Sequence, residues 1–143
     1  MNLGAVKLRR PPSIKRMKQV WVIDDDPISQ DLVAEAMYYI GTDMKVSYFG
    51  GCLDFMRSMS YIENYKEEPD FIILDTNEID HNKLIDQLKD HWKQIPLVLW
   101  SENFYRSRRK TLLESGADDV FKKPINLKRA MTLIKGMKNR YLN

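Results

Sequence analysis

From Val20 to the end of the chain, short apolar runs alternate with longer amphipathic segments, and this alternation limits the possible folds more than any other feature. The runs have the length of buried β-strands, and the segments between them carry apolar residues at helical spacing. Repeated strand–helix units are typical of a parallel sheet covered by helices on both faces. The expected strands are residues 20–23, 45–49, 71–74, 97–100 and 119–121.

A helix is expected after each strand, and two of the helices have clear starting signals. Asp26 and Pro27 suit the N-cap and first turn of a helix that ends at Gly41, and Asn126 suits the N-cap of the last helix. The apolar positions along the first helix are Ile28, Leu32, Ala36 and Ile40. The other helices are expected from Cys52 through Leu53 to Met59, from about Asn82 to Trp92, and from Phe104 to Ser115. This order predicts a doubly wound α/β fold, a flavodoxin-like (βα)5 unit with strand order 2-1-3-4-5.

Length and charge limit the domain organisation. The 143 residues suit one domain, and no apolar run approaches the ~20 residues of a membrane span. The first 18 residues carry six basic and no acidic side chains, whereas the rest of the chain is mildly acidic. We therefore expect a basic, disordered leader over residues 1–17, in which Met17 is an alternative start, and one domain over residues 18–143. The single cysteine and the absence of a secretory signal predict a cytoplasmic protein. Direct nucleic-acid binding is not expected, because Pro11-Pro12 and the lack of apolar periodicity favour a disordered leader as the explanation of the basic segment.

Polar residues follow four of the expected strands. They are Asp24 and Asp25, Asp75, Ser101, and Lys123. Because ligands bind at the carboxyl ends of strands in an open parallel sheet, these four strand ends predict one shared site. Each residue alone has a simpler explanation, such as a helix cap, a turn or a solvated charge, but four strand ends with helix-length spacers favour a common function.

The residues of this predicted site suit phosphoryl transfer. Carboxylates as close as Asp24, Asp25 and Asp75 repel one another unless a cation neutralises them, and such oxygen ligands suit Mg²⁺. Asp75 can then act as a carboxylate nucleophile that forms an aspartyl phosphate. Lys123 and the Ser101 hydroxyl can neutralise or bind the oxygens of the incoming phosphoryl group.

The chain resembles the receiver domains of two-component response regulators from about Lys18 to Tyr141. The motifs that carry the resemblance are VWVIDDDP, PDFIILDTN, PLVLWSE and GADDVFKKPIN. The resemblance implies that Asp25 and Asp75 bind Mg²⁺ directly, that the Asn77 carbonyl is a third ligand and that Asp24 acts through water. It also implies phosphorylation at Asp75 by a histidine kinase or phosphotransfer protein, a switch role for Ser101, a phosphoryl-binding role for Lys123, and a cis peptide before Pro124.

The sequence departs from the family pattern at the position that usually reports phosphorylation. An aromatic residue is usual there, whereas this chain has Val120, and the adjacent Phe121 should point to the opposite face of its strand. The segment from Thr76 to His81 lacks the usual proline and glycine. In the family, the helix expected at Phe104 to Ser115, the fifth strand and the last helix form the output and homodimer surface, which would be basic here.

Two other functions stay open at this point. One is a receiver-like interaction module that is never phosphorylated, although such a module would be expected to lose Asp75, Ser101 or Lys123. The other is a phosphatase like the haloacid dehalogenases, which would use an aspartate of the first strand as its nucleophile. Neither a dedicated metabolic activity nor a membrane partner is expected.

Overall fold

The structure is a computed structural model that describes residues 17–41, 43–62, 68–76 and 81–142. Asn77 and the predicted leader up to residue 16 lie outside this described part. The strands are β1 (Lys18–Ile23), β2 (Met44–Phe49), β3 (Phe71–Asp75), β4 (Leu97–Ser101) and β5 (Asp119–Lys122). The helices are α2 (Pro27–Ile40), α3 (Cys52–Ile62), α4 (His81–His91), α5 (Arg106–Glu114) and α6 (Leu127–Tyr141).

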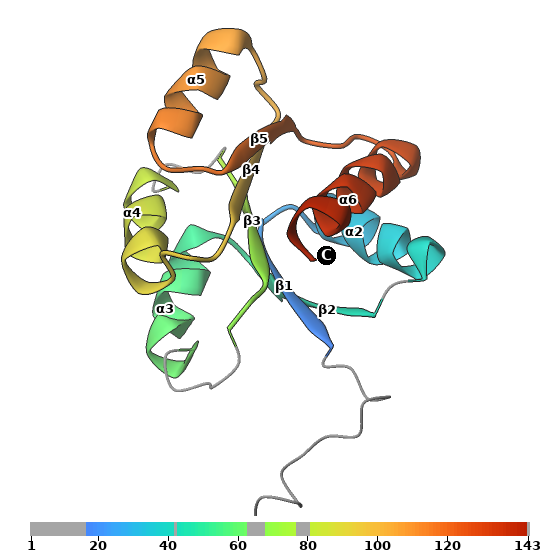
Figure 1. The fold of residues 1–143 in the computed structure, drawn as a ribbon, viewed down its shortest axis with the longest axis horizontal. Helices are drawn as coiled ribbons and strands as arrows, with labels where there is room; N and C mark the ends of the chain where they lie inside the picture. The colour runs from blue at the N-terminus through green and yellow to red at the C-terminus, as the bar shows by residue number, and fades with distance from the viewer. Residues whose placement is uncertain (1–16, 42, 63–67, 77–80, 143) are drawn as a thin grey trace, which may run out of the picture.

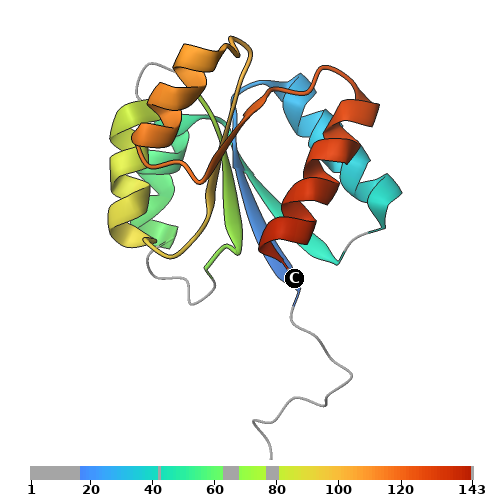
Figure 2. The same ribbon diagram turned by 45° about the horizontal axis from the view of Figure 1, so that its top comes forward.

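The five strands form one parallel sheet in the order β2-β1-β3-β4-β5, which confirms the predicted topology. The sheet lies between two layers of helices, with α3, α4 and α5 on one face and α2 and α6 on the other (Figures 1 and 2). Strand order reverses between β1 and β3, so the carboxyl ends of these two strands flank the switch point of the sheet.

Each face of the sheet has its own hydrophobic core, because successive strand residues point to opposite faces. Trp21, Ile72 and Leu99 pack towards α3, α4 and α5, whereas Val22, Ile73 and Trp100 pack towards α2 and α6. Both sides of β3 and β4 are therefore buried, which explains their continuously apolar sequences.

Both ends of α2 and the start of α6 are those expected from the sequence. The Asp26 side chain accepts a hydrogen bond from the backbone N–H of Ile28, and Gly41 ends α2 with a φ of 62°. Asn126 accepts from the backbone N–H of Arg129 at the start of α6. These side chains and the left-handed glycine satisfy backbone groups that a helix end would otherwise leave without a partner.

The prediction that Ile28 and Leu53 face the core is wrong. Ile28 is 70% exposed and Leu53 is 57% exposed, whereas Ser29, Val33 and Met37 are the neighbours that α2 buries beside Ala36. The buried stripe of α2 is thus turned by about one residue from the predicted one, because α6 packs beside this helix as well as the sheet.

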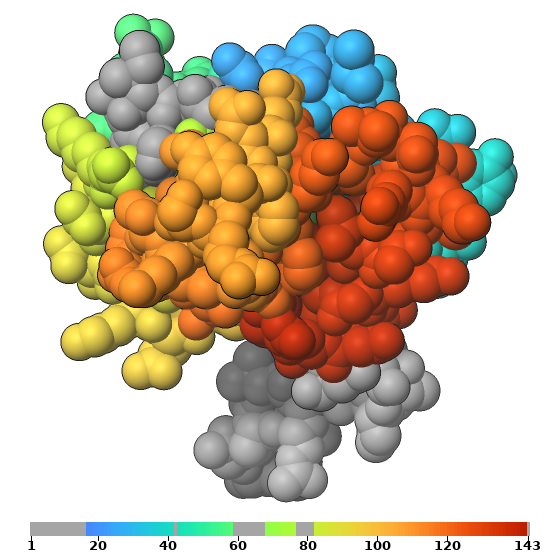
Figure 3. Space-filling model, turned by 90° about the horizontal axis from the view of Figure 1, so that it is seen from above, coloured from blue at the N-terminus to red at the C-terminus, as the bar shows by residue number. Residues whose placement is uncertain are grey.

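The carboxyl ends of the strands meet at one end of the molecule. Seen from that end, the start of α2, the turn after β4 and the turn after β5 surround the edge of the sheet (Figure 3). None of the helices within the described residues is long and apolar enough to cross a membrane.

Candidate functional site

Three aspartates come together at the switch point of the sheet. Asp24 and Asp25 follow β1, and Asp75 ends β3 beside it. Carboxylate oxygens of all three lie within 4.8 Å of one another. Asp24 and Asp75 are buried and Asp25 is exposed, so the cluster is open to solvent on the side of Asp25.

Lys123 lies among these carboxylates. Its backbone N–H donates to the carbonyl of Ser101 at 2.9 Å, which extends the pairing of β4 with β5 by one bond. Its Nζ atom is 3.0 Å from Asp24 Oδ2 and 3.2 Å from Asp75 Oδ2, and both contacts are buried. Asp26 Oδ2 is more distant, at 3.7 Å. One lysine therefore joins the carboxylates that follow β1 and β3.

Asp24 is enclosed by donors from three directions. The Trp100 indole N–H donates to Asp24 Oδ2 at 3.0 Å, the backbone N–H of Asp26 donates to Oδ1 at 2.9 Å, and Lys123 contacts both oxygens. Burial nevertheless raises the pKa of Asp24 from 3.8 to about 6, and the nearby charge of Asp75 adds to this rise. The hydrogen bonds from Asp26 and Lys123 oppose it without cancelling it.

The pKa of Lys123 is raised as well. Burial on its own lowers the pKa of a lysine, but the hydrogen bond with Asp24 and the charges of Asp24 and Asp75 outweigh that effect. The ammonium group is therefore held in its charged form between the two carboxylates.

Ser101 and Thr76 extend the site from β4 and β3. Ser101 is fully buried, and its hydroxyl donates to the Asn103 carbonyl at 3.2 Å. Thr76 is buried directly after Asp75, and its backbone N–H and hydroxyl donate to the Trp100 carbonyl at 3.1 and 3.2 Å. Arg108 reaches both residues from α5, with Nη2 donating to the Thr76 carbonyl at 3.1 Å and Nε to Ser101 Oγ at 3.4 Å.

Two features that bear on the family's usual switch are also described. Val120 is buried in the core under α3, α4 and α5, whereas Phe121 packs against the core under α2 and α6. The expectation that Phe121 points away from Val120 is thereby confirmed. The expected cis peptide before Pro124 is wrong, because every peptide bond among the described residues is trans; nothing else in the structure accounts for this difference.

The donor set suits a hard divalent cation such as Mg²⁺. Three carboxylates within 4.8 Å provide oxygen ligands with an excess of negative charge. Both oxygens of Asp24 already accept hydrogen bonds from the protein, whereas Asp25 is exposed, so Asp25 is better placed than Asp24 to bind a cation directly. Asn77, the third ligand that the resemblance implied, lies outside the described residues.

Sequence reasoning did not assign Trp100 and Arg108 to the site. A sequence signal existed for Trp100, because it directly precedes Ser101 at the end of the fourth expected strand. In the structure it pairs in register with Asp75. Arg108 is one of several basic residues in its helix, and its spacing along the chain does not distinguish it from Arg106 or Arg109. Only the packing of α5 against the ends of β3 and β4 brings its guanidinium to the site.

Comparison with known proteins identifies related sequences. Residues 20–135 match the family described as the response regulator receiver domain. The transcriptional regulatory protein TrcR of Mycobacterium tuberculosis is 26% identical over 124 residues, which cover 85% of this chain and 46% of TrcR. The alkaline phosphatase synthesis transcriptional regulatory protein SphR of Synechococcus elongatus is also 26% identical, over 93% of this chain and 53% of SphR. The chain thus spans about half the length of these curated relatives.

Solved structures share the fold at lower identity. The phosphorylated cyanobacterial phytochrome response regulator RcpA superposes with a TM-score of 0.73 at 21% identity, over 90% of this chain and 96% of RcpA. The Mn²⁺-bound form of the response regulator Rcp1 gives a TM-score of 0.69 at 19% identity, over 88% of this chain and 95% of Rcp1. A response regulator from Thermotoga maritima gives 0.69 at 18% identity, over 87% and 99% of the two chains.

Proposed function

Because this chain belongs to the response regulator receiver domain family of two-component systems, we propose that it accepts a phosphoryl group on Asp75. The observation that carries this proposal is the contact of Lys123 Nζ with both Asp24 and Asp75, inside a cluster of three carboxylates. A buried lysine at 3.2 Å from Asp75 provides a fixed positive charge where the oxygens of a transferred phosphoryl group would lie.

In the proposed reaction, a carboxylate oxygen of Asp75 attacks the phosphorus atom of the donor, and the bond from phosphorus to the donor's leaving group breaks. The product is an aspartyl phosphate, and the leaving group departs with the electrons of that bond. Lys123 neutralises phosphoryl oxygens, and the Ser101 hydroxyl donates a hydrogen bond to one of them. Mg²⁺ held by Asp25 and Asp75, with Asn77 as a further ligand and Asp24 through water, would neutralise the charge of the carboxylates and phosphoryl group.

The main test is incubation of the chain with Mg²⁺ and acetyl phosphate, followed by intact mass spectrometry. We expect the mass of one phosphoryl group to be added, and we expect none in EDTA or in Asp75→Asn. A chain that stays unmodified under conditions that label another receiver domain would favour the interaction module that is never phosphorylated. Phosphatase activity that survives in Asp75→Asn would favour the dehalogenase-like alternative.

A histidine kinase or a phosphotransfer protein is the proposed physiological donor, and we infer where it docks. A pocket of about 370 Å³ beside Lys123 is lined in part by Ile28 and Ile125, whose side chains are 70% and 79% exposed. Exposed apolar side chains at the mouth of a charged site are typical of a protein interface with an apolar centre. A donor protein that covers Ile28 and Ile125 would bring its phosphorylated side chain close to Lys123 and Asp75.

This docking surface is tested by comparing a protein donor with a small one. Ile125→Glu should slow phosphotransfer from a phosphorylated partner protein by roughly tenfold or more, since a central interface residue contributes about 1–4 kcal/mol. Labelling by acetyl phosphate should be unchanged. Tyr38→Glu is the control, because Tyr38 is 81% exposed, about as much as Ile125, but does not line the pocket. Equal effects of both substitutions would contradict the docking surface.

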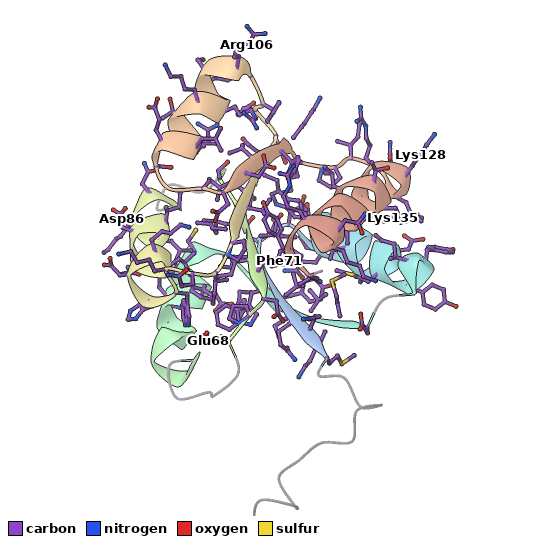
Figure 4. All side chains as sticks on the ribbon, in the orientation of Figure 1. Glu68, Phe71, Asp86, Arg106, Lys128 and Lys135 are labelled. Carbon is purple, nitrogen blue, oxygen red and sulfur yellow. The ribbon has the colours of Figure 1, made fainter. Side chains whose placement is uncertain are left out.

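We propose that output is by protein contacts through α5, β5 and α6, either in a homodimer or with an effector protein. This surface carries basic side chains that include Arg106, Lys128 and Lys135, all of which lie on the outside of their helices (Figure 4). The domain would then be a cytoplasmic signalling module without a dedicated enzymatic activity beyond its own phosphorylation and dephosphorylation.

A further inference from the structure

Helix α5 is attached to the rest of the domain by few apolar contacts. Among its residues, Arg106–Glu114, only Leu112 is buried. Its N-cap residue, Tyr105, makes no side-chain capping bond. In Figure 1, α5 lies at the end of the layer that it shares with α3 and α4. Apart from Leu112 and the partly buried Leu113, which pack against the core, polar contacts hold α5 in place.

Arg108 makes two of these polar contacts, and both reach the proposed phosphorylation site. Its Nη2 atom donates to the carbonyl of Thr76, the residue after Asp75, at 3.1 Å. Its Nε atom donates to Ser101 Oγ at 3.4 Å, near the upper limit of a hydrogen bond. The rigid guanidinium fork thus joins α5 to the ends of β3 and β4 at the same time.

The Ser101 hydroxyl has a different role in each of two contacts. A serine hydroxyl has one proton, and Arg108 can only donate, so Ser101 accepts from Arg108 and donates its proton to the Asn103 carbonyl at 3.2 Å. While it donates to Asn103, the hydroxyl cannot donate to a phosphoryl oxygen on Asp75. Donation to a phosphoryl oxygen therefore requires the Ser101 side chain to turn away from Asn103. Because that turn moves Oγ, it also lengthens the contact with Arg108 Nε, which at 3.4 Å is already near the limit of a hydrogen bond.

We propose that Arg108 is a positioning residue that holds Ser101 in its unphosphorylated orientation, and that formation of the aspartyl phosphate breaks the contact of Arg108 with Ser101 and loosens α5. This inference rests on the proposed phosphorylation of Asp75. Val120 is small and buried, and it has no aromatic ring that could turn on phosphorylation and so connect the site to a surface helix. In this chain Arg108 would make that connection.

The first test compares rates of labelling by acetyl phosphate at saturating Mg²⁺ and saturating donor. Arg108→Ala removes a hydrogen bond that Ser101 must otherwise give up, so the rate should rise roughly 3- to 10-fold, as expected for one hydrogen bond. Arg108→Lys retains the charge but not the fork, and it should also be faster than the wild type. Arg106→Ala is the matched control, because it removes the same charge from the same helix at an end that points into solvent (Figure 4).

The outcomes separate this inference from the proposed function. A wild-type chain that takes no phosphoryl group contradicts both. A wild-type chain that is labelled at the same rate as Arg108→Ala contradicts only the role of Arg108. A slower Arg108→Ala also contradicts it, because Arg108 would then bind the phosphoryl group instead of restraining Ser101.

A second readout follows α5 itself by hydrogen–deuterium exchange. In the wild type, amide exchange in α5 should increase after phosphorylation, by roughly 3- to 10-fold for the loss of one hydrogen bond. In Arg108→Ala it should already be increased without phosphorylation and change little afterwards. Exchange in α5 that responds equally to phosphorylation in the wild type and in Arg108→Ala would overturn the inference.

Discussion

At the residue scale, the contacts of the site converge on Asp24. Its carboxylate accepts hydrogen bonds from Trp100, Asp26 and Lys123, and it is fully buried. Such a group is costly to bury without partners and is held in one position when it has them. Asp24 therefore positions Lys123 for Asp75 as well as contributing charge to the carboxylate cluster.

The contact between Trp100 and Asp24 is predicted to contribute to stability. Trp100→Phe removes the indole N–H from a buried carboxylate and leaves space in the core, so the free energy of unfolding should fall by about 2–4 kcal/mol in urea denaturation. A double-mutant cycle with Asp24→Asn isolates the contact from the loss of volume. A coupling energy near zero would show that the hydrogen bond contributes nothing to stability.

The raised pKa of Asp24 predicts a pH dependence of folding stability. Burial raises its pKa from 3.8 in the unfolded chain to about 6 in the folded one, so the folded state binds an additional proton between these values. This contribution to stability is complete below pH 3.8 and is lost as the pH rises through about 6.

The comparison of the wild type with Asp24→Asn, in EDTA, measures this contribution. The difference between their free energies of unfolding should change by roughly 2 kcal/mol between about pH 4.5 and pH 7, in favour of Asp24→Asn at the higher pH. Effects of the amide side chain itself cancel, because they are present at both pH values. A difference that does not change with pH would mean that Asp24 titrates equally in the folded and unfolded chains.

At the element scale, β5 begins at a buried charge that connects two helices. Asp119 is 7% exposed, and it accepts from Arg109 of α5 at 3.3 Å and from Arg140 of α6. It also accepts from the backbone N–H of Val120 at 2.8 Å. Two basic side chains of the proposed output surface are thus bound within the domain, and they are less available to a partner than Arg106 or Lys128.

We expect Asp119→Asn to destabilise the domain by about 1–2 kcal/mol, because it removes a charge that two arginines contact at a buried position. Glu114→Gln is the control. Its pair with Lys110, at 4.0 Å between exposed side chains, should contribute less than about 0.5 kcal/mol. Thermal or urea unfolding of both variants measures these changes in stability. Equal losses of stability in the two variants would contradict the claim that the buried contacts of Asp119 stabilise the domain more than an exposed ion pair does.

At the scale of the whole molecule, the sequence was sufficient for the topology and for the gathering of the site. The continuous apolar runs of β3 and β4 and the caps at Asp26 and Asn126 are local signals, and the parallel sheet brings strand ends together by geometry alone. Contacts that depend on how a helix packs on the sheet could not be predicted from these local signals. The turn of α2 that exposes Ile28 and the reach of Arg108 from α5 both depend on tertiary packing.

The most direct test of the account locates the phosphoryl group. After reaction with Mg²⁺ and acetyl phosphate, borohydride reduces an aspartyl phosphate to homoserine, and tandem mass spectrometry identifies the residue that carries the change. We predict homoserine at position 75 and none when the donor or Mg²⁺ is left out. Homoserine at position 24 or 25 with unmodified Asp75 would contradict the assignment of Asp75 as the phosphoacceptor.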